Sequence, residues 1–338
     1  MPPETLSVAD QSELLVSLIR MRLLAPGEQT PLTPLTGGVS SLIVRAETPG
    51  GALCVKRALA QLKVAAVWEA PVERNRAEVA WMKVAGAIVP DAVPAILGED
   101  PEACAFAMAW LEPADYPVWK SQLLAGTALP ATARAVAHNL VAIHAATADN
   151  AELARQFAND DNFYALRLEP YFMATAKRHP ECADALHQLV KVTADKRRVL
   201  VHGDISPKNI LIGPKGPVFL DAECAWYGDP AFDLAFCLNH LLLKCVWRPE
   251  SAPDYLACYD LLAATYLQGV NWEPLAELEA RTTALLAGML LARIDGKSPV
   301  EYITQEGDRE RVRQFAVPLL LQPPDSLQAL RQRWSQNA

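Results

Sequence analysis

HGDISPKN, residues His202–Asn209, and FLDAE, residues Phe219–Glu223, are the two stretches that decide the interpretation of this chain. Short apolar runs alternate with them, and the turn-rich sequence GPKGP lies between them, which predicts a strand–loop–strand–turn–strand segment. Together they carry three carboxylates and one amide side chain: Asp204, Asp221, Glu223 and Asn209. These groups lie near one another if the apolar runs pair as a hairpin. Such oxygen ligands suit Mg²⁺, and a carboxylate that is not bound to the metal could orient or deprotonate a hydroxyl group.

The composition is that of a globular chain. It has 338 residues, 51% hydrophobic and 21% charged, which allows one large or two ordinary domains with a sizeable core. These values exclude a disordered, collagen-like or disulfide-stapled chain. Lys and Arg number 31 against 39 Asp and Glu, a formal charge of −8. This acidic balance argues against general nucleic-acid binding, which needs a basic surface.

Targeting signals are not evident in the sequence. The longest apolar run, near 284–292, is well short of the roughly 20 residues that cross a bilayer, and the N-terminus lacks the basic start and apolar stretch of a signal peptide. The seven cysteines are scattered without CxxC spacing, which favours buried thiols in a reducing compartment over a zinc site. We therefore expect a cytoplasmic protein with no membrane or nucleic-acid partner; no particular oligomeric state is indicated.

The order of predicted elements indicates an α+β protein. A helix over 8–24 is followed from Pro31 by a three-strand meander, a helix over 72–86 and two short strands, VPAILG and CAFAMAW. After Trp110 most segments have helical spacing: 131–147, 181–196, 230–245, 254–268 and 274–294. We expect a small β-rich domain over 1–110 and a larger, mainly helical domain over 111–338. The turn-rich stretch 111–117, LEPADYP, is the expected hinge.

The HGD sequence, with an asparagine five residues after the aspartate and D-x-E downstream, resembles the catalytic segment of kinase-fold phosphotransferases. Its HGD form is similar to that of the aminoglycoside phosphotransferase and choline kinase-like superfamily, and the resemblance covers roughly residues 30–300. It implies a two-lobed protein-kinase-like fold, ATP and Mg²⁺ as cofactors, and a small-molecule acceptor. By this resemblance Asp204 is the catalytic base, Asn209, Asp221 and Glu223 form the metal site, and His202 has a structural role.

The resemblance also implies three nucleotide-binding elements in the N-terminal domain, which occur in the expected order. Gly37, Gly38 and Ser40, in LTGGVSS, would cover the phosphates. Lys56, in ALCVKR on the third predicted strand, would contact them. Glu78, on the following helix, would orient Lys56. Taken singly, each element has a simpler explanation: a Gly-Gly hairpin turn, an edge-strand lysine, and a helix glutamate paired with Arg74 at i,i+4.

The stretch 108–112, MAWLE, is the expected adenine-binding segment. By the same resemblance, backbone groups at Trp110 and Glu112 would bind the adenine edge, and Met108 would flank the ring. A buried methionine on a strand is also an ordinary core residue, and both interpretations of Met108 stay open.

Several segments resemble methylthioribose kinases, a branch of this superfamily: the D-x-E site, the following AWYGDPAFD, and FYALRLEPYF over 163–172. Those kinases contact substrate through adjacent arginines on a late helix; here only Arg293 matches, after Ala292. This chain also keeps Asn209, which those kinases usually lack. The resemblance therefore implies a small sugar, polyol or amino-alcohol as acceptor, with a methylthioribose-like sugar among them.

Three residues are candidates for acceptor contacts: Trp226, Asp229 and Arg293. Each has a structural alternative. Trp226 could pack beneath the HGD stretch, Asp229 could cap the following helix, and Arg293 could be a favourable cation near a helix C-terminus. Lys208 could neutralise phosphate or point to solvent. Asp233 is expected at a helix start, bonded to the backbone of the HGD stretch.

The leading hypothesis is an ATP- and Mg²⁺-dependent kinase that phosphorylates a hydroxyl group of a small molecule. An aminoglycoside or other antibiotic phosphotransferase is one alternative, although the moderately acidic NDD at 159–161 does not favour a polycationic acceptor. A catalytically silent nucleotide-binding module is a second alternative. A metal-dependent hydrolase is a third, but it leaves Lys56 and the Gly-Gly stretch unexplained.

Overall fold

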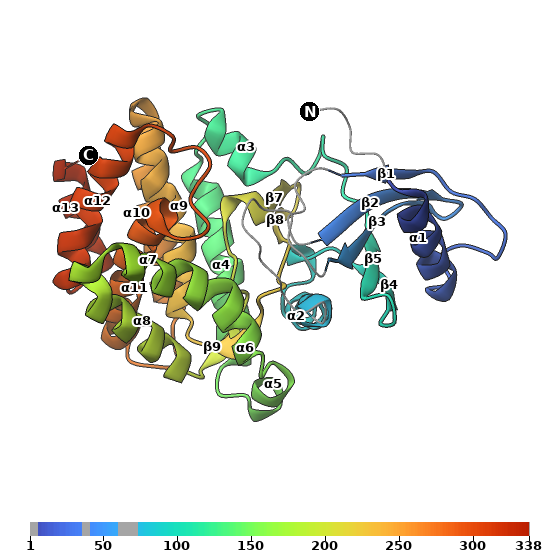
Figure 1. Cartoon of the computed structure of the whole chain (residues 1–338), viewed down its shortest axis with the longest axis horizontal. Coiled ribbons are helices and arrows are strands. Elements are labelled where there is room, and N and C mark those ends of the chain that lie inside the picture. The colour runs from blue at the N-terminus through green and yellow to red at the C-terminus, as the bar shows by residue number, and fades with distance from the viewer. Residues whose placement is uncertain (1–5, 36–40, 60–73, 338) are drawn as a thin grey trace.

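The computed structural model describes residues 6–35, 41–59 and 74–337. A small lobe built on an antiparallel sheet is joined to a larger lobe made mainly of helices, shown on the right and the left of Figure 1. We call these the sheet lobe and the helical lobe. The mixed α+β class predicted from the sequence is confirmed, whereas the domain boundary at residues 110 and 111 stays a prediction.

The sheet lobe contains five strands in the order β1-β2-β3-β5-β4, with every neighbouring pair antiparallel. Their bounds are Leu32–Pro34 for β1, Ser41–Thr48 for β2, Gly51–Ala58 for β3, Ile96–Asp100 for β4 and Ala105–Ala109 for β5. The predicted strands are all present. Gly37, Gly38 and Ser40 lie outside the described residues.

Two helices cover the two faces of this sheet. Helix α1, Val8–Arg20, buries Leu14 and Leu18 against alternate residues of β2 and β3, as the two-residue period of a strand requires. It begins at Ser7, whose hydroxyl accepts the Asp10 N–H at 3.0 Å, and it ends four residues before the predicted end at 24. Helix α2, Arg74–Ile88, packs on the other face. On β3, Lys56 shares this second face with Cys54 because the two residues are two apart.

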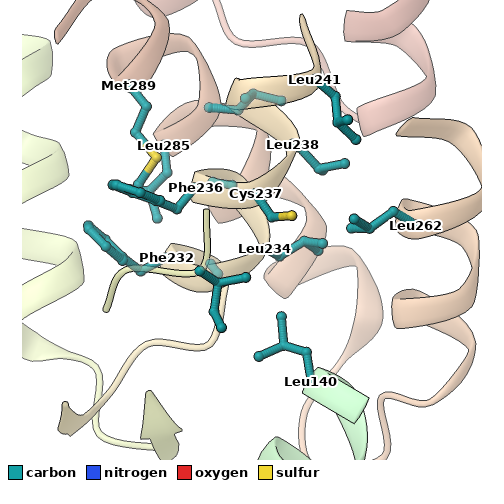
Figure 2. Close-up of a cluster of buried hydrophobic side chains, with 14 of the residues drawn as sticks. Leu140, Phe232, Leu234, Phe236, Cys237, Leu238, Leu241, Leu262, Leu285 and Met289 are labelled. Carbon is teal, nitrogen blue, oxygen red and sulfur yellow. The ribbon is translucent and has the colours of Figure 1, made fainter. Parts of the chain in front are cut away.

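The helical lobe is organised around helix α9, Ala231–Trp247, in which every residue from 231 to 246 is buried. A helix that is apolar on all sides must be surrounded by other elements. Figure 2 shows side chains of α9, among them Phe232, Phe236 and Leu241, between Leu140, Leu262, Leu285 and Met289 of neighbouring helices. Helices α4, Pro130–Thr147, α10, Ala252–Gln268, and α11, Leu275–Asp295, provide these neighbours.

The remaining helices complete this lobe. They are α3 Trp119–Leu124, α5 Ala151–Gln156, α6 Asp160–Phe163, α7 Ala174–Arg178, α8 Ala183–Asp195, α12 Glu306–Leu321 and α13 Leu327–Asn337, with a π-helical segment, η2, at Tyr164–Met173. Short 3-10 turns lie at Pro90–Ala92, Pro180–Cys182, Pro207–Asn209 and Pro249–Ser251. In the described part of the chain, no helix combines the length and the apolar character needed to cross a membrane.

Two small strand pairs carry the HGD stretch and the D-x-E site. Strands β7, Ile210–Gly213, and β8, Gly216–Phe219, form the predicted hairpin, with Ile210 opposite Phe219. Strand β6, Val199–Val201, pairs instead with β9, Trp226–Gly228. The segment between β6 and β7, residues 202–209, is called the HGD loop below. Its Gly203 has a φ of +82°, and a Cβ atom there would lie 2.8 Å from the Cys224 carbonyl oxygen.

Substitution of Gly203 tests how closely the HGD loop packs on the segment after β8. Gly203→Ala adds a steric contact to the strain of a positive φ, so we expect it to lower the free energy of unfolding by about 2–4 kcal/mol. Gly216→Ala is the matched control, because Gly216 also has a positive φ, +124°, but no atom within 4 Å of its Cβ position. It should cost about 1 kcal/mol in urea unfolding. If the two variants lose equal free energy of unfolding, the contact with Cys224 adds no cost to a side chain at position 203.

Candidate active site

Asp233 fixes the start of the HGD loop. Its side chain, in the first turn of α9, accepts the N–H of His202 at Oδ2 and that of Gly203 at Oδ1, both at 2.8 Å. His144 Nε2 lies 3.3 Å from the same Oδ2, and all these groups are buried. Two loop N–H groups that would otherwise be buried without partners are thereby satisfied. The expected contact between Asp233 and the loop backbone is confirmed.

His202 is buried beside the aromatic rings of Trp81 and Phe219. Its Nδ1 accepts the backbone N–H of Asp204 at 3.1 Å, and its ring lies edge-on to Trp81 and near Phe219. Burial lowers the pKa of His202, which keeps the imidazole neutral. The geometry favours the structural role that the resemblance implies for this histidine.

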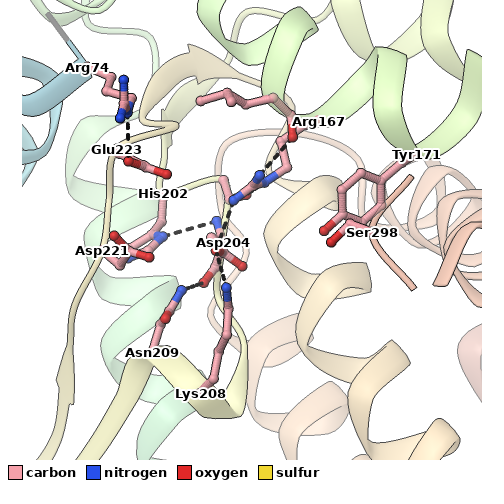
Figure 3. A network of polar contacts seen from close by, with 12 residues as sticks. Arg74, Arg167, Tyr171, His202, Asp204, Lys208, Asn209, Asp221, Glu223 and Ser298 are labelled. Atoms are coloured by element: carbon pink, nitrogen blue, oxygen red, sulfur yellow. Dashed lines mark hydrogen bonds and ion pairs between the residues drawn. The ribbon is translucent and has the colours of Figure 1, made fainter. Parts of the chain in front are cut away.

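Asp204 has two cationic neighbours. Arg167, from the π-helical segment η2, places Nη2 2.9 Å from Asp204 Oδ2 and donates from Nε to the Gly203 carbonyl at 2.5 Å. Lys208 Nζ lies 3.3 Å from the same Oδ2 and its side chain is about half exposed. Figure 3 shows both cations converging on this carboxylate. The two contacts hold the Asp204 carboxylate in one orientation.

Lys56 joins the two lobes through a buried group of three charges. Its Nζ lies 2.7 Å from Glu78 Oε2 on α2 and also forms an ion pair with Asp221 Oδ1, beyond β8. Burial alone would lower the pKa of Lys56, but the carboxylates of Asp221 and Glu78 raise it above its usual range. The lysine is therefore charged at neutral pH.

The pKa values of Glu78 and Asp221, which share the Lys56 ammonium, shift in opposite directions. Burial raises the pKa of Glu78 to about 7 against the opposing effect of Lys56. Burial also favours the neutral form of Asp221, but Lys56 and Lys208 hold its pKa well below the usual range. Asp221 thus carries the negative charge that faces the HGD loop. It also adopts a φ of +69°, a strained conformation for a non-glycine residue and one that is common at functional sites.

Asn209 and Glu223 complete the set predicted for a metal. The Asn209 amide donates from Nδ2 to the Asp204 carbonyl at 3.1 Å, which orients this side chain. Glu223 Oε2 lies 3.0 Å from Nε of Arg74, and Arg74 also donates to the Leu59 carbonyl at 2.7 Å. The Arg74–Glu223 pair was not predicted from the sequence, which offered an i,i+4 pair of Arg74 with Glu78 only as the simpler alternative. Glu78 contacts Lys56.

The donor set fits a magnesium ion that is bound together with a polyphosphate. Among the described residues there is no group of three or more His, Cys, Asp or Glu side chains arranged to hold a metal. Mg²⁺ does not need such a cage, because it commonly binds through one or two carboxylates, phosphate oxygens and water. The ionised carboxylate of Asp221 and the amide oxygen of Asn209 are donors of the required kind. A softer metal would need nitrogen or sulfur ligands, which this set does not offer.

The expected adenine-binding segment leaves the sheet at the end of β5. Met108 is buried in the core that continues into the helical lobe. Trp110 donates from Nε1 to the Glu112 carboxylate at 3.0 Å, and the Arg45 guanidinium lies 4.9 Å from its ring centroid. On the sheet, Met108 lies opposite Cys54 of β3, and Trp110 and Glu112 follow the end of β5. Their binding role stays a prediction.

The three acceptor candidates do not come together. Asp229 is fully buried, accepts the Ala231 N–H at 3.0 Å at the start of α9, and forms a two-contact ion pair with Arg281. Trp226 is buried and stacks on Phe163 with ring centroids 4.2 Å apart. These positions favour the capping and packing alternatives. Arg293 instead donates to Tyr171 Oη at 3.1 Å, and the Tyr171 ring centroid lies 5.9 Å from the guanidinium of Arg167.

Asp233 can be tested by its effect on stability. Asp233→Asn keeps the shape but replaces one acceptor oxygen with a donor, so one loop N–H loses its partner. We expect the free energy of unfolding to fall by about 1–3 kcal/mol in chemical denaturation. Asp195→Asn is the control, since that exposed i,i+4 pair with Lys191 contributes about 0.5 kcal/mol or less. An Asp233→Asn loss no larger than that of the control would contradict the role assigned to Asp233.

Comparisons with known proteins show relatives of this chain and structures with its fold. Methylthioribose kinase 2 of Oryza sativa subsp. japonica is 24% identical over 221 residues, which are 57% of this chain and 52% of that protein. The chain therefore spans about half the length of the curated relatives it matches. Two solved structures share the fold. An ethanolamine kinase of Plasmodium vivax has a TM-score of 0.55 at 11% identity, covering 92% of this chain and 86% of that one. The amicoumacin kinase hAmiN has a TM-score of 0.56 at 13% identity, covering 96% and 97%.

The family assignment rests on a wider match. The model of the phosphotransferase enzyme family matches residues 31–243, which is more than half of the 338 residues. This region includes β1 to β9 and most of α9, and so the sheet, the HGD loop, the D-x-E site and Asp233. The chain belongs to the phosphotransferase enzyme family.

Proposed function

We propose that this protein is an ATP-dependent phosphotransferase that moves the γ-phosphate of ATP to a hydroxyl group of a small molecule. The observation that carries the proposal is the ion pair from Lys56 of the sheet lobe to Asp221, beside the HGD loop that holds Asp204. A cation for phosphates, a carboxylate for a metal and a second carboxylate for an acceptor are thereby assembled at one place. Membership of the phosphotransferase enzyme family supports it.

The nucleotide would bind where the sheet lobe meets the HGD loop. Lys56, charged and held by Glu78, would contact its phosphates, and Gly37, Gly38 and Ser40 would lie over them. Backbone groups at Trp110 and Glu112, with Met108, would receive the adenine. The structure of the amicoumacin kinase was solved with AMP-PNP and Ca²⁺, which supports a nucleotide and a divalent metal as ligands of this fold.

Asn209 and Asp221 would hold Mg²⁺, with a smaller contribution from Glu223, because one of its oxygens is bound to Arg74. The metal, when bound, would supply positive charge that stabilises the transferred phosphoryl group. Lys56 adds a fixed positive charge at the same place, and the short ion pair keeps it directed at Asp221. The paired charges make this part of the site rigid before substrate binds.

Asp204 would orient the acceptor hydroxyl and accept its proton. Arg167 and Lys208 both contact Oδ2, so Oδ1 is the oxygen that we expect to face the hydroxyl. As the hydroxyl oxygen attacks the γ-phosphorus, its proton passes to Asp204 and the bond to ADP breaks. The likeness to methylthioribose kinases supports a sugar, polyol or amino-alcohol as the acceptor.

The proposal is tested by incubating the protein with ATP, Mg²⁺ and a panel of sugars, polyols and amino-alcohols, and detecting the phosphorylated product by mass spectrometry. We expect Asp204→Asn to lower the rate of product formation by about 10²–10⁴-fold, because it removes the general base. Its affinity for ATP should stay close to that of the unsubstituted protein. Asp195→Asn, an exposed carboxylate on α8, is the control. Full activity of Asp204→Asn would refute the mechanism.

The metal site is tested by titrating Mg²⁺ in the same assay. Asp221→Asn should raise the Mg²⁺ concentration that gives half-maximal rate by about a hundredfold or more, since a direct ligand is lost. Glu223→Gln should raise it by about tenfold. Glu181→Gln, which changes an exposed glutamate near the C-terminus of α7, should leave it unchanged. A response of Asp221→Asn no greater than that of Glu181→Gln would exclude Asp221 as a ligand.

A further inference from the structure

We propose that the acceptor carries an anionic group, a carboxylate or a phosphate, which binds at Lys244, Arg293 and His240 on the helical side of Asp204. This inference rests on the proposed function and specifies its substrate class. We call these three residues the cationic cluster. Each is at least nine-tenths buried, and each keeps a polar atom for which the described residues provide no hydrogen-bond partner.

Lys244 is the clearest unpaired charge. It lies on α9 with only 1% of its surface exposed, and its Nζ has neither a hydrogen bond nor an ion pair among the described residues. Its neighbours are rings: Nζ lies 4.2 Å from the centroid of Tyr302 and 5.6 Å from that of Trp247. Ring faces attract a cation but do not replace the hydrogen bonds that it loses on burial. Among the described residues, this buried ammonium therefore has no anion in hydrogen-bonding contact.

Arg293 has hydrogen-bond partners, but all of them are uncharged. Its Nη1 donates to Tyr171 Oη at 3.1 Å, to Ser298 Oγ at 3.0 Å and to the Ser298 carbonyl. Its Nε is buried without a partner among the described residues. Buried arginines are ordinarily matched by a carboxylate, as Arg74 is by Glu223 in this same chain. Arg293 departs from that pattern.

His240 is the third member of the cationic cluster. Its Nδ1 lies 3.3 Å from Tyr302 Oη, and its Nε2 is buried without a described partner. Burial lowers its pKa, and the charges that lower it further all belong to cations: Arg293, Lys244, Lys208 and Lys120. One carboxylate lies nearby, that of Glu301, but it is paired with Lys120. The local charge therefore stays positive, and a neutral His240 can donate a hydrogen bond from its free nitrogen.

A series of side-chain contacts links Arg293 of the cationic cluster to Asp204. Arg167 contacts Asp204, its guanidinium lies 5.9 Å from the Tyr171 ring centroid, and Tyr171 accepts a hydrogen bond from Arg293. Figure 3 shows Tyr171 and Ser298 on the side of Arg167 and Asp204 that faces the helices. In this proposal the acceptor hydroxyl lies at Asp204 and the anionic group lies at Arg293 and Lys244.

The charge of the cluster discriminates between acceptor classes. An anion would restore the partners that Lys244 and Arg293 lack, with charge-assisted hydrogen bonds. An ammonium group at the same place would be repelled by cations in a poorly solvated environment. Acids and phosphate esters are therefore favoured over amino-alcohols and amino sugars of the same size.

Matched acceptors that differ only in charge test the inference. One set is glucose, glucuronate, glucose 6-phosphate and glucosamine; another is glycerol, glycerate, glycerol 3-phosphate and serinol. We expect a higher kcat/KM for an acid or a phosphate ester than for the neutral and amine members, and the two anionic arms decide between carboxylate and phosphate. A preference for the neutral or the amine member in both sets would overturn the inference and leave the proposed function intact.

Two variants test the cluster itself. Lys244→Met and Arg293→Gln should each raise KM for the anionic acceptor by about ten- to a hundredfold, as expected for a lost charged hydrogen bond, with KM for ATP unchanged. Lys191→Met, an exposed lysine on α8, is the matched control. Lys244→Met should also raise the midpoint of thermal unfolding by about 2 °C or more, because an uncompensated buried charge is removed. A lower midpoint with unchanged KM would assign Lys244 a structural role and overturn the proposal.

A binding measurement distinguishes a failure of the proposed function from a failure of the anion site. Glucuronate, glycerate and inorganic phosphate are titrated calorimetrically into the protein and into Lys244→Met. If ATP binds but no acceptor is phosphorylated, the proposed function fails. Anion binding that Lys244→Met abolishes would then still support the anion site. The absence of binding of any of the three anions would overturn it.

Discussion

A single buried ammonium, that of Lys56, must be balanced by carboxylates from two different parts of the chain. Glu78 on α2 supplies one and Asp221 beyond β8 supplies the other. Close carboxylate partners offset the cost of burying this charge, so the sheet lobe is held against the segment that follows β8. The strained backbone of Asp221 is maintained by the same contact.

The HGD loop depends in turn on the apolar core. Helix α9 is buried from residue 231 to 246, and its first turn carries Asp233, which holds the backbone of His202 and Gly203. A rigid, fully packed helix thus positions a loop that has little regular structure of its own. Arg167 then fixes the Asp204 side chain from the opposite side. Such support from packed elements is what a precise catalytic arrangement requires.

The sequence predicts those elements whose pattern lies within one short stretch of the chain. Periodic apolar residues located the strands and long helices, and the spacing within HGDISPKN and FLDAE indicated the hairpin that brings the carboxylates together. The pairs Arg74–Glu223 and Arg167–Asp204 could not be predicted in this way, because their partners are 149 and 37 residues apart and meet only through tertiary packing. The role of Asp229 could not be decided from the sequence for the same reason, since its partner Arg281 lies on α11.

The most direct test of the central claim is a crystal structure of the protein with a non-hydrolysable ATP analogue and Mg²⁺. The account predicts the triphosphate between Lys56 and the HGD loop, the metal on Asp221 and Asn209, and the γ-phosphorus facing Asp204. A nucleotide bound elsewhere, or a triphosphate that contacts neither Lys56 nor the metal at Asp221, would contradict it.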